Sequence, residues 1–199
     1  MKLVSKLAAS NPVLEVVAAH RAFAERQALF DVHLKASGGE IIALLGPNGA
    51  GKTSLMRAIA GRLKLDKGSV TVVGSDPQVV SAAREKLGIV PQTIALYPSL
   101  TARQNLDVFA RLAGLKSAAI QKSVKLALSR AQLEDRANDQ LSELSGGMQR
   151  RLNIVAGTLH NPELLLLDEP TVGVDLDARQ TIHALLHDLR DAGMAIIVS

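Results

Sequence analysis

Apolar positions in the first ninety residues fall in short runs, some alternating with polar positions and some continuous. Glycine and proline separate these runs, which is the pattern of β-strands joined by turns. The strands are expected near residues 13–19, 29–34, 41–45, 70–73 and 88–90. The opening half of the chain is therefore predicted to be rich in strands.

The pattern becomes helical after Pro98. Thr101 and Gln104 have the spacing of a capping box, in which each residue's side chain hydrogen-bonds to the backbone of the other. An apolar stripe follows, and Gly114 is placed to end the helix. A second helical stretch covers about residues 118–131. These segments predict a helical insert after the strands.

Continuous apolar runs return in the last forty residues. Leu164–Leu167 and Ala195–Val198 are expected to be strands buried on both faces. An amphipathic helix is predicted between them, over residues 177–190. The order of strands, helical insert, then strand, helix and strand predicts an α/β fold.

Composition agrees with one folded module. The 199 residues are enough for one sizeable α/β domain and too few for two, and 47% of them are hydrophobic, which excludes disorder as the main description. No apolar run approaches the roughly 20 residues of a membrane-spanning helix, and the first residues do not resemble a signal peptide. The absence of cysteine excludes disulfides and thiolate metal sites, so the cytosol is the expected compartment.

Charge is unevenly distributed along the chain. Residues 1–141 carry 19 basic and 11 acidic side chains, whereas residues 142–199 carry 4 basic and 8 acidic ones. A basic first part could indicate nucleic acid, but there are only four aromatic residues and no run rich in lysine and arginine. Polyphosphate binding or a solvated surface explains the charge at least as well, so no nucleic-acid partner is expected.

The most informative motif is a glycine-rich loop that follows the apolar run at 41–45 and opens a predicted helix at 53–60. It matches the phosphate-binding pattern of glycine, four residues, then Gly-Lys-Thr. Backbone N–H groups and the helix N-terminus would converge on the phosphates, the lysine would neutralise the β- and γ-phosphates, and the threonine hydroxyl would bind Mg²⁺. The loop consists of Gly46, Pro47, Asn48, Gly49, Ala50, Gly51, Lys52 and Thr53, and Ser54 is assigned to the same nucleotide site.

Two acidic residues end the buried run Leu164–Leu167. Paired charges are costly at such a place unless they serve a purpose. Beside a phosphate loop, Asp168 is expected to hold Mg²⁺, directly or through water, and Glu169 to polarise the attacking water. The alternative is a strand that simply ends at a polar turn before Pro170.

A second anion site is predicted at Leu144-Ser145-Gly146-Gly147, ahead of a helix-compatible stretch at 150–159. With this motif the sequence resembles the nucleotide-binding subunit of an ATP-binding cassette (ABC) transporter, for which Leu-Ser-Gly-Gly is the family signature. The resemblance runs from about residue 14 to 199. It implies a P-loop NTPase core, about 1–97 and 160–199 with a β-rich N-terminal subdomain, and an inserted helical subdomain at about 98–159.

The resemblance also implies roles for residues that would otherwise attract no attention. Gln92 matches the glutamine loop, which contacts Mg²⁺ or the attacking water and couples to the membrane subunit. Phe23 lies where the family places an aromatic ring that stacks on adenine, although it could also be an ordinary core residue. Asp175 matches a loop at the dimer interface. The implied cofactors are ATP and Mg²⁺.

The sequence departs from the family pattern at its histidines. The family has a switch histidine just after the strand expected at Ala195–Val198, and no histidine of this chain lies there, so we expect a C-terminally truncated subunit with poor turnover. His183 and His187 have the spacing of a metal pair, but a solvated helix face is the expected reading. The five histidines are His20, His33, His160, His183 and His187.

The leading functional hypothesis is an ATPase that powers export through a separate integral membrane subunit. Segments 96–106 and 171–175 resemble the exporter branch with separate membrane subunits. Two chains would form a head-to-tail homodimer around two ATP molecules, peripheral to the inner face of the cell membrane. The alternatives are a soluble ABC module acting on DNA or ribosomes, and a regulatory ATP-binding subunit with little turnover.

Overall fold

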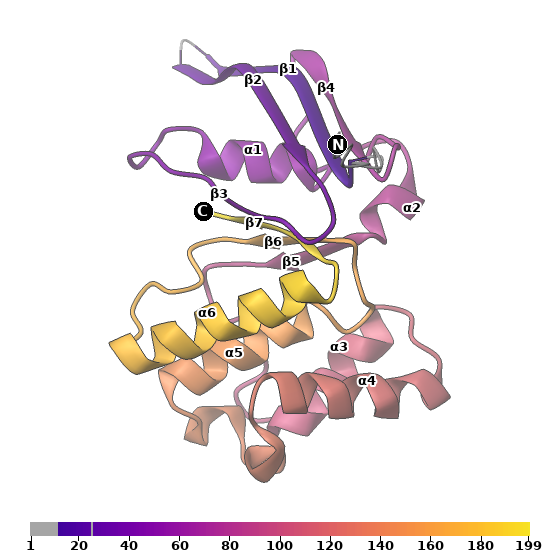
Figure 1. Ribbon diagram of the computed structural model, residues 1–199, viewed down its shortest axis with the longest axis vertical. Helices are drawn as coiled ribbons and strands as arrows, with labels where there is room; N and C mark the ends of the chain where they lie inside the picture. Colours follow the sequence, from indigo (N-terminus) through magenta and orange to yellow (C-terminus); the bar gives the residue numbers. More distant parts are fainter. Residues whose placement is uncertain (1–11, 25) are drawn as a thin grey trace, which may run out of the picture.

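A three-stranded antiparallel sheet forms the upper part of the molecule (Figure 1). The computed structural model describes residues 12–24 and 26–199. The sheet has the order β2-β1-β4, with β1 (Leu14–Phe23) between β2 (Arg26–Ala36) and β4 (Lys67–Val72). Helix α1 (Lys52–Ile59) lies between this sheet and the second one.

The second sheet is parallel and four-stranded, with the order β3-β7-β6-β5. In this sheet Val90 pairs with Leu167, and Leu167 pairs with Val198. The carboxyl ends of three strands therefore meet at one edge, and the residues that follow them lie together. The strands are β3 (Ile41–Ala43), β5 (Leu87–Val90), β6 (Leu164–Leu167) and β7 (Ala195–Val198).

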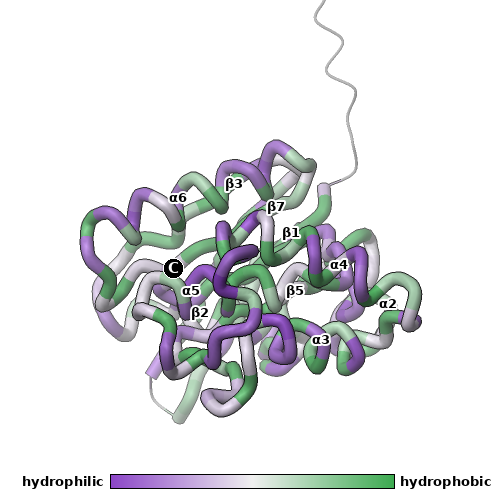
Figure 2. The backbone as a smooth tube through the Cα atoms, turned by 90° about the horizontal axis from the view of Figure 1, so that it is seen from below, coloured by the Kyte–Doolittle hydropathy of each residue, from purple (hydrophilic) through white to green (hydrophobic). Residues whose placement is uncertain are grey.

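The helices other than α1 and α2 lie on the far side of the parallel sheet (Figure 1). Figure 2 shows hydrophilic and hydrophobic stretches recurring from turn to turn along α6, as expected for a helix with one buried face. No helix in the described part of the chain is both long enough and apolar enough to cross a bilayer. The helices are α2 (Ser81–Arg84), α3 (Ala102–Leu112), α4 (Ser117–Arg130), α5 (Gly146–Ala156) and α6 (Leu176–Asp191), with short 3₁₀ turns at Glu134–Arg136 and Leu141–Glu143.

The core has two halves, one on each face of the parallel sheet. Successive side chains of a strand point to opposite faces. In β6, Leu164 and Leu166 pack towards α1 and the antiparallel sheet, whereas Leu165 and Leu167 pack towards the other helices. All four are at most 1% exposed, which explains why this strand is a continuous apolar run.

The predicted α/β fold is confirmed, and so are the predicted capping box at Thr101 and the glycine that ends α3, since Gly114 has φ +79°. Some predicted boundaries were wrong. Strand β3 ends at Ala43 rather than at residue 45: the Leu44 N–H still donates to the Val198 carbonyl at 2.7 Å, but Leu45 is 90% exposed. Helix α5 begins at Gly146, capped by Ser145, and ends at Ala156, before the end of the helix-compatible stretch at 150–159.

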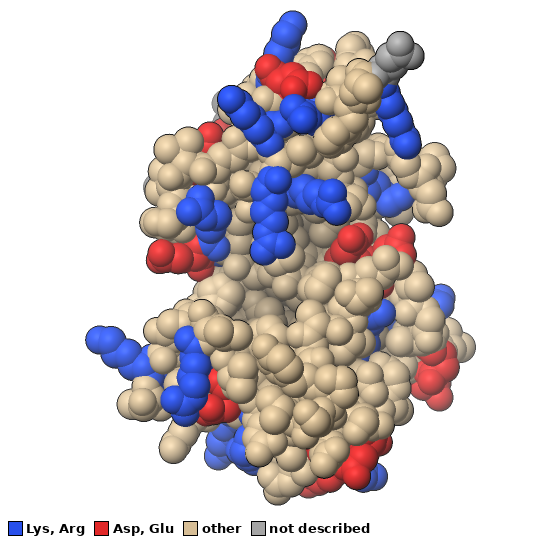
Figure 3. All heavy atoms as spheres, turned by 180° about the vertical axis from the view of Figure 1, so that it is seen from behind, with Lys and Arg blue, Asp and Glu red and all other residues tan. Residues whose placement is uncertain are grey.

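Basic side chains gather on the upper half of the face seen in Figure 3, above a hollow that crosses the middle of that face. This half contains β1, β2, β4 and α1 (Figure 1). The excess of basic residues in the first part of the sequence therefore has a counterpart on the surface.

Candidate functional site

Four polar residues meet where the parallel strands end. The Ser199 hydroxyl follows β7, donates to Asp168 Oδ1 at 2.7 Å and accepts from the Glu169 backbone N–H at 3.1 Å. The Gln92 side-chain amide follows β5 and donates to Glu169 Oε2 at 2.7 Å. These contacts link the ends of three neighbouring strands. They bring the predicted Gln92, Asp168 and Glu169 into one cluster.

Glu169 has a left-handed backbone, with φ +45°. A residue with a Cβ atom adopts this conformation only at a cost, and such residues concentrate at functional sites. The Ser199 hydroxyl holds the Glu169 N–H, and the Asp168 N–H donates to the Val90 carbonyl at 3.0 Å. The turn after β6 is thus held in place by both neighbouring strands.

The glycine-rich loop between β3 and α1 depends on its glycines. A Cβ atom on Gly51 would lie 2.1 Å from the Ala28 carbonyl oxygen, and Gly51 has φ +91°, so only glycine fits there. Lys52 folds back over the loop. Its Nζ donates to the carbonyls of Gly46 at 2.6 Å and Pro47 at 3.1 Å. The lysine charge is therefore held against the loop.

The glycine-rich loop and the strand-end cluster, which contributes Gln92, Asp168 and Glu169, face one hollow of about 660 Å³. Its polar lining comes from both, and an aromatic ring lies at its margin. Gly46, Pro47 and Ala50 belong to the loop but do not line the hollow. None of the five histidines lies among its described lining residues. The lining residues are Phe23, Arg26, Ala28, Asn48, Gly49, Gly51, Lys52, Thr53, Ser54, Gln92, Asp168 and Glu169.

These residues fit a nucleotide with Mg²⁺. The first turn of α1 presents backbone N–H groups and the positive end of the helix, and the Lys52 charge lies beside them. Thr53 and Asp168 supply a hydroxyl and a carboxylate, which are the oxygen ligands that Mg²⁺ prefers. The arrangement suits a polyphosphate better than an apolar ligand.

Phe23 lies at the margin of the hollow and is not a core residue, since 45% of it is exposed. The Arg21 guanidinium lies over its ring, with Cζ 4.9 Å from the centroid. Arg21 also pairs with Asp66, whose Oδ2 accepts the Ala22 N–H at 2.7 Å. This backbone hydrogen bond, helped by Arg21, lowers the pKa of Asp66.

Sequence reasoning missed three residues near the site. Arg26 lines the hollow and donates to the Gly49 carbonyl at 3.0 Å, and Ser199 connects Asp168 to Glu169. Arg150 is buried in α5 and donates to the Gln92 carbonyl, and burial lowers the pKa of its guanidinium. None of them belongs to a motif, so only their places in the fold reveal them.

The predicted signature residues do not line this hollow. The Ser145 hydroxyl caps α5 by accepting the Met148 N–H at 3.3 Å, and Gly146 begins that helix. A Cβ atom on Gly147 would lie 2.5 Å from the Ala178 Cβ, so a glycine lets α5 approach α6 closely. Asp175 caps α6 by accepting the Ala178 N–H at 2.7 Å. Within one chain, the phosphate loop and the signature do not share a site.

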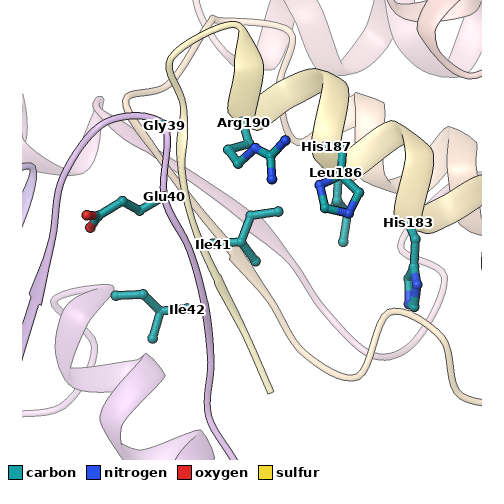
Figure 4. Close-up of a pocket in the computed structure, with 8 residues that line it drawn as sticks. All are labelled: Gly39, Glu40, Ile41, Ile42, His183, Leu186, His187 and Arg190. Carbon is teal, nitrogen blue, oxygen red and sulfur yellow. The ribbon is translucent and has the colours of Figure 1, made fainter.

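A second hollow, of about 790 Å³, lies between α6 and the chain around β3. Figure 4 shows His183, His187 and Arg190 extending from α6, Ile41 pointing towards that helix, and Glu40 pointing away. Both histidines are exposed, as predicted. No group of three potential metal ligands occurs in the described residues.

Curated proteins similar to this chain are ATP-binding proteins. The linearmycin resistance ATP-binding protein LnrL of Bacillus subtilis strain 168 is 40% identical, over 89% of this chain and 57% of its own length. The Nod factor export ATP-binding protein I of Bradyrhizobium diazoefficiens is 38% identical, over 96% of this chain and 62% of its own length. The chain thus spans about three fifths of the length of these relatives.

Solved structures give the same result. The structure of cbiO1 from Clostridium perfringens, part of the ABC transporter complex cbiONQ, superposes with a TM-score of 0.86 at 28% identity, covering 95% of this chain and 78% of that one. An ATP-binding subunit of an ABC transporter superposes with a TM-score of 0.80 at 27% identity, covering 94% and 79%. The sequence profile described as ABC transporter matches residues 29–172. With its phosphate loop and strand-end carboxylates in one hollow, the chain belongs to the ABC transporter family.

Proposed function

We propose that this chain binds ATP with Mg²⁺ and hydrolyses it, and that the hydrolysis powers export through a partner membrane subunit. The observation that carries the proposal is the meeting of the phosphate loop with Gln92, Asp168 and Glu169 in one hollow. A phosphate-binding loop alone would support binding. The carboxylates beside it add the groups that hydrolysis requires.

In this proposal the loop from Gly46 to Ser54 binds the phosphates through its backbone N–H groups, and Lys52 neutralises the β- and γ-phosphates. Phe23 stacks on the adenine ring. Thr53, Gln92 and Asp168 hold Mg²⁺, which when bound offsets the charge of the phosphate oxygens. Glu169 orients the attacking water and accepts its proton, and the amide of Gln92 keeps the Glu169 carboxylate in place.

Two copies of the chain would complete the site. Ser145, Gly146, Gly147 and Asp175 do not line the hollow of their own chain, yet the N-terminus of α5 is suited to an anion. A head-to-tail homodimer would place these residues of one copy over the phosphates bound by the other. Such an arrangement has twofold symmetry and contains two equivalent sites.

Export is supported by the names of the relatives, which refer to Nod factor export and linearmycin resistance. A chain of this kind would act at the cytoplasmic face of the membrane through an integral membrane subunit. Purification from detergent-solubilised membranes of the host tests this, with recovery of a membrane protein in constant ratio as the expected result. Recovery of the chain with ribosomes or DNA would contradict the proposal.

The ATPase proposal is tested by two substitutions, one expected to reduce ATP binding and the other to reduce hydrolysis. Lys52→Ala removes a charge-assisted contact to phosphate, so we expect ATP affinity to fall by about tenfold or more. Glu169→Gln keeps the size and hydrogen bonding of the side chain but removes the base, so we expect intact binding and phosphate release slowed by about 10² or more. Titration calorimetry and a phosphate-release assay measure the two. Unchanged ATP affinity in Lys52→Ala, or normal turnover in Glu169→Gln, would contradict the assignment.

A further inference from the structure

Arg26 is a second cation in the hollow, and the phosphate-loop motif does not include it. It begins β2, lines the same hollow as Lys52, and donates from Nη2 to the Gly49 carbonyl at 3.0 Å. A Cβ atom on Gly49 would lie 2.2 Å from this nitrogen. The guanidinium therefore lies directly over the phosphate loop, in space that the glycine leaves open.

The position of Arg26 along the hollow is also defined. Arg26 is the strand partner of Phe23 where β1 and β2 join. It thus connects the wall that carries the aromatic ring with the loop that carries Lys52 and Thr53. If a nucleotide has its base at Phe23 and its terminal phosphates at the loop, the Arg26 guanidinium lies beside the part of the nucleotide between them.

We propose that Arg26 binds the phosphate chain of the nucleotide, next to the base, and so contributes to the preference for di- and triphosphates; this inference rests on the proposed ATP site. A guanidinium has five N–H donors in a planar fork, so it can bind phosphate oxygens while keeping its contact with the loop. Its charge would act together with that of Lys52 at the opposite end of the phosphate chain.

Titrations of Arg26→Gln and Arg26→Lys with ATP, ADP and adenosine test the proposal. Titration calorimetry measures the nucleotides, and saturation-transfer NMR measures the weakly bound adenosine. We expect Arg26→Gln to weaken ATP and ADP binding by about tenfold or more and to leave adenosine binding unchanged. We expect Arg26→Lys to recover part of the loss, because it restores the charge but not the fork. Arg62→Gln, which removes an exposed arginine outside the hollow, is the matched control and should bind all three ligands normally.

Two results would overturn the role of Arg26. One is wild-type ATP affinity in Arg26→Gln. The other is an equal loss of ATP and adenosine, which would mean that Arg26 only maintains the shape of the hollow. Thermal unfolding without nucleotide shows whether each variant is folded. If Arg26→Gln is not folded, the nucleotide affinities of Arg26→Lys test the proposal instead. If Lys52→Ala binds ATP normally the proposed function fails, whereas loss in Lys52→Ala with full affinity in Arg26→Gln overturns only this inference.

Discussion

Individual side chains of the site are held by partners far away in the sequence. Phe23 lies under Arg21, and Arg21 is held by Asp66, which also accepts the Ala22 N–H. The end of β1 is therefore fixed by a carboxylate that precedes β4. Because the pKa of Asp66 is lowered in the folded state, folding and ionisation of this group are linked.

Neutralising Asp66 should destabilise the protein only at pH values at which the wild-type carboxylate is ionised. A carboxyl group with a lowered pKa in the folded state stabilises above its ordinary pKa of 3.8, and this stabilisation is lost as the pH falls through the lowered value. We expect Asp66→Asn to unfold at a lower temperature than wild type at about pH 7, with the difference vanishing near pH 2. Thermal denaturation across this range measures it. Glu85→Gln, which alters an exposed carboxylate, is the matched control substitution.

The site residues were predicted either from local motifs or, for Gln92 and Phe23, from the resemblance to the family. The phosphate loop is a continuous motif, and Asp168 and Glu169 directly follow a recognisable buried strand. Arg26 and Ser199 contact residues 23 and 31 positions away, and no local pattern marks such contacts. The left-handed backbone of Glu169 is also invisible in the sequence, because nothing but the fold requires it.

At the scale of elements, α5 connects two parts of the proposed mechanism. Its N-terminus carries the signature, and further along it Arg150 donates to the Gln92 carbonyl while Asn153 accepts the Ala95 N–H at 3.2 Å. The segment after β5 is therefore attached to the helical insert as well as to the strand-end cluster. A displacement of α5 would move Gln92 relative to Glu169.

Removing the attachment at Arg150 should slow hydrolysis more than it weakens binding. Arg150→Met keeps an unbranched buried side chain but leaves the Gln92 carbonyl without this donor. We expect kcat for phosphate release to fall about ten- to hundredfold with little change in ATP affinity, because a misplaced group mainly affects the transition state. Arg151→Met is the control, since Arg151 donates instead to the Ala131 carbonyl at the end of α4. Equal effects of the two substitutions on kcat would refute a specific role for Arg150.

Elements were predictable where the apolar pattern was strong. The buried strand Leu164–Leu167 agrees with its prediction to the residue, and α6 differs from its prediction by one residue at each end. Helix α2 has only four residues, too few for a periodic pattern, and the sequence did not reveal it. Strand β2 is longer than the predicted 29–34, because its polar outer positions still pair with β1.

At the scale of the whole molecule, the signature and the phosphate loop occupy separate places. Ser145 and Asp175 are used within the chain as helix caps, and their remaining surfaces are exposed. This is the arrangement that the proposed head-to-tail dimer requires. The two anion sites were predicted from the sequence to meet only between two chains, and within one chain the signature residues lie outside the hollow of the phosphate loop.

The dimer can be tested in a background that binds ATP without turnover. We expect Glu169→Gln to dimerise with MgATP, and the double variant with Ser145→Arg to remain monomeric, because the added side chain fills the anion site offered to the partner. Size-exclusion chromatography measures the difference. Ser129→Arg, an equal change on the exposed side of α4, serves as the control and should leave the dimer peak intact. An undiminished dimer in the Ser145→Arg double variant would place the signature outside the interface.

The order of strands in the parallel sheet also bears on how the protein is made. Strand β7 lies between β3 and β6, so Ile41 finds its partner only in Ile196. A ribosome releases β3 long before β7, and until then the strand that leads into the phosphate loop has no neighbour in its sheet. Long-range pairing of this kind folds slowly and leaves strand edges open in the meantime. The nucleotide site therefore cannot be complete until β7 has emerged from the ribosome and inserted between β3 and β6.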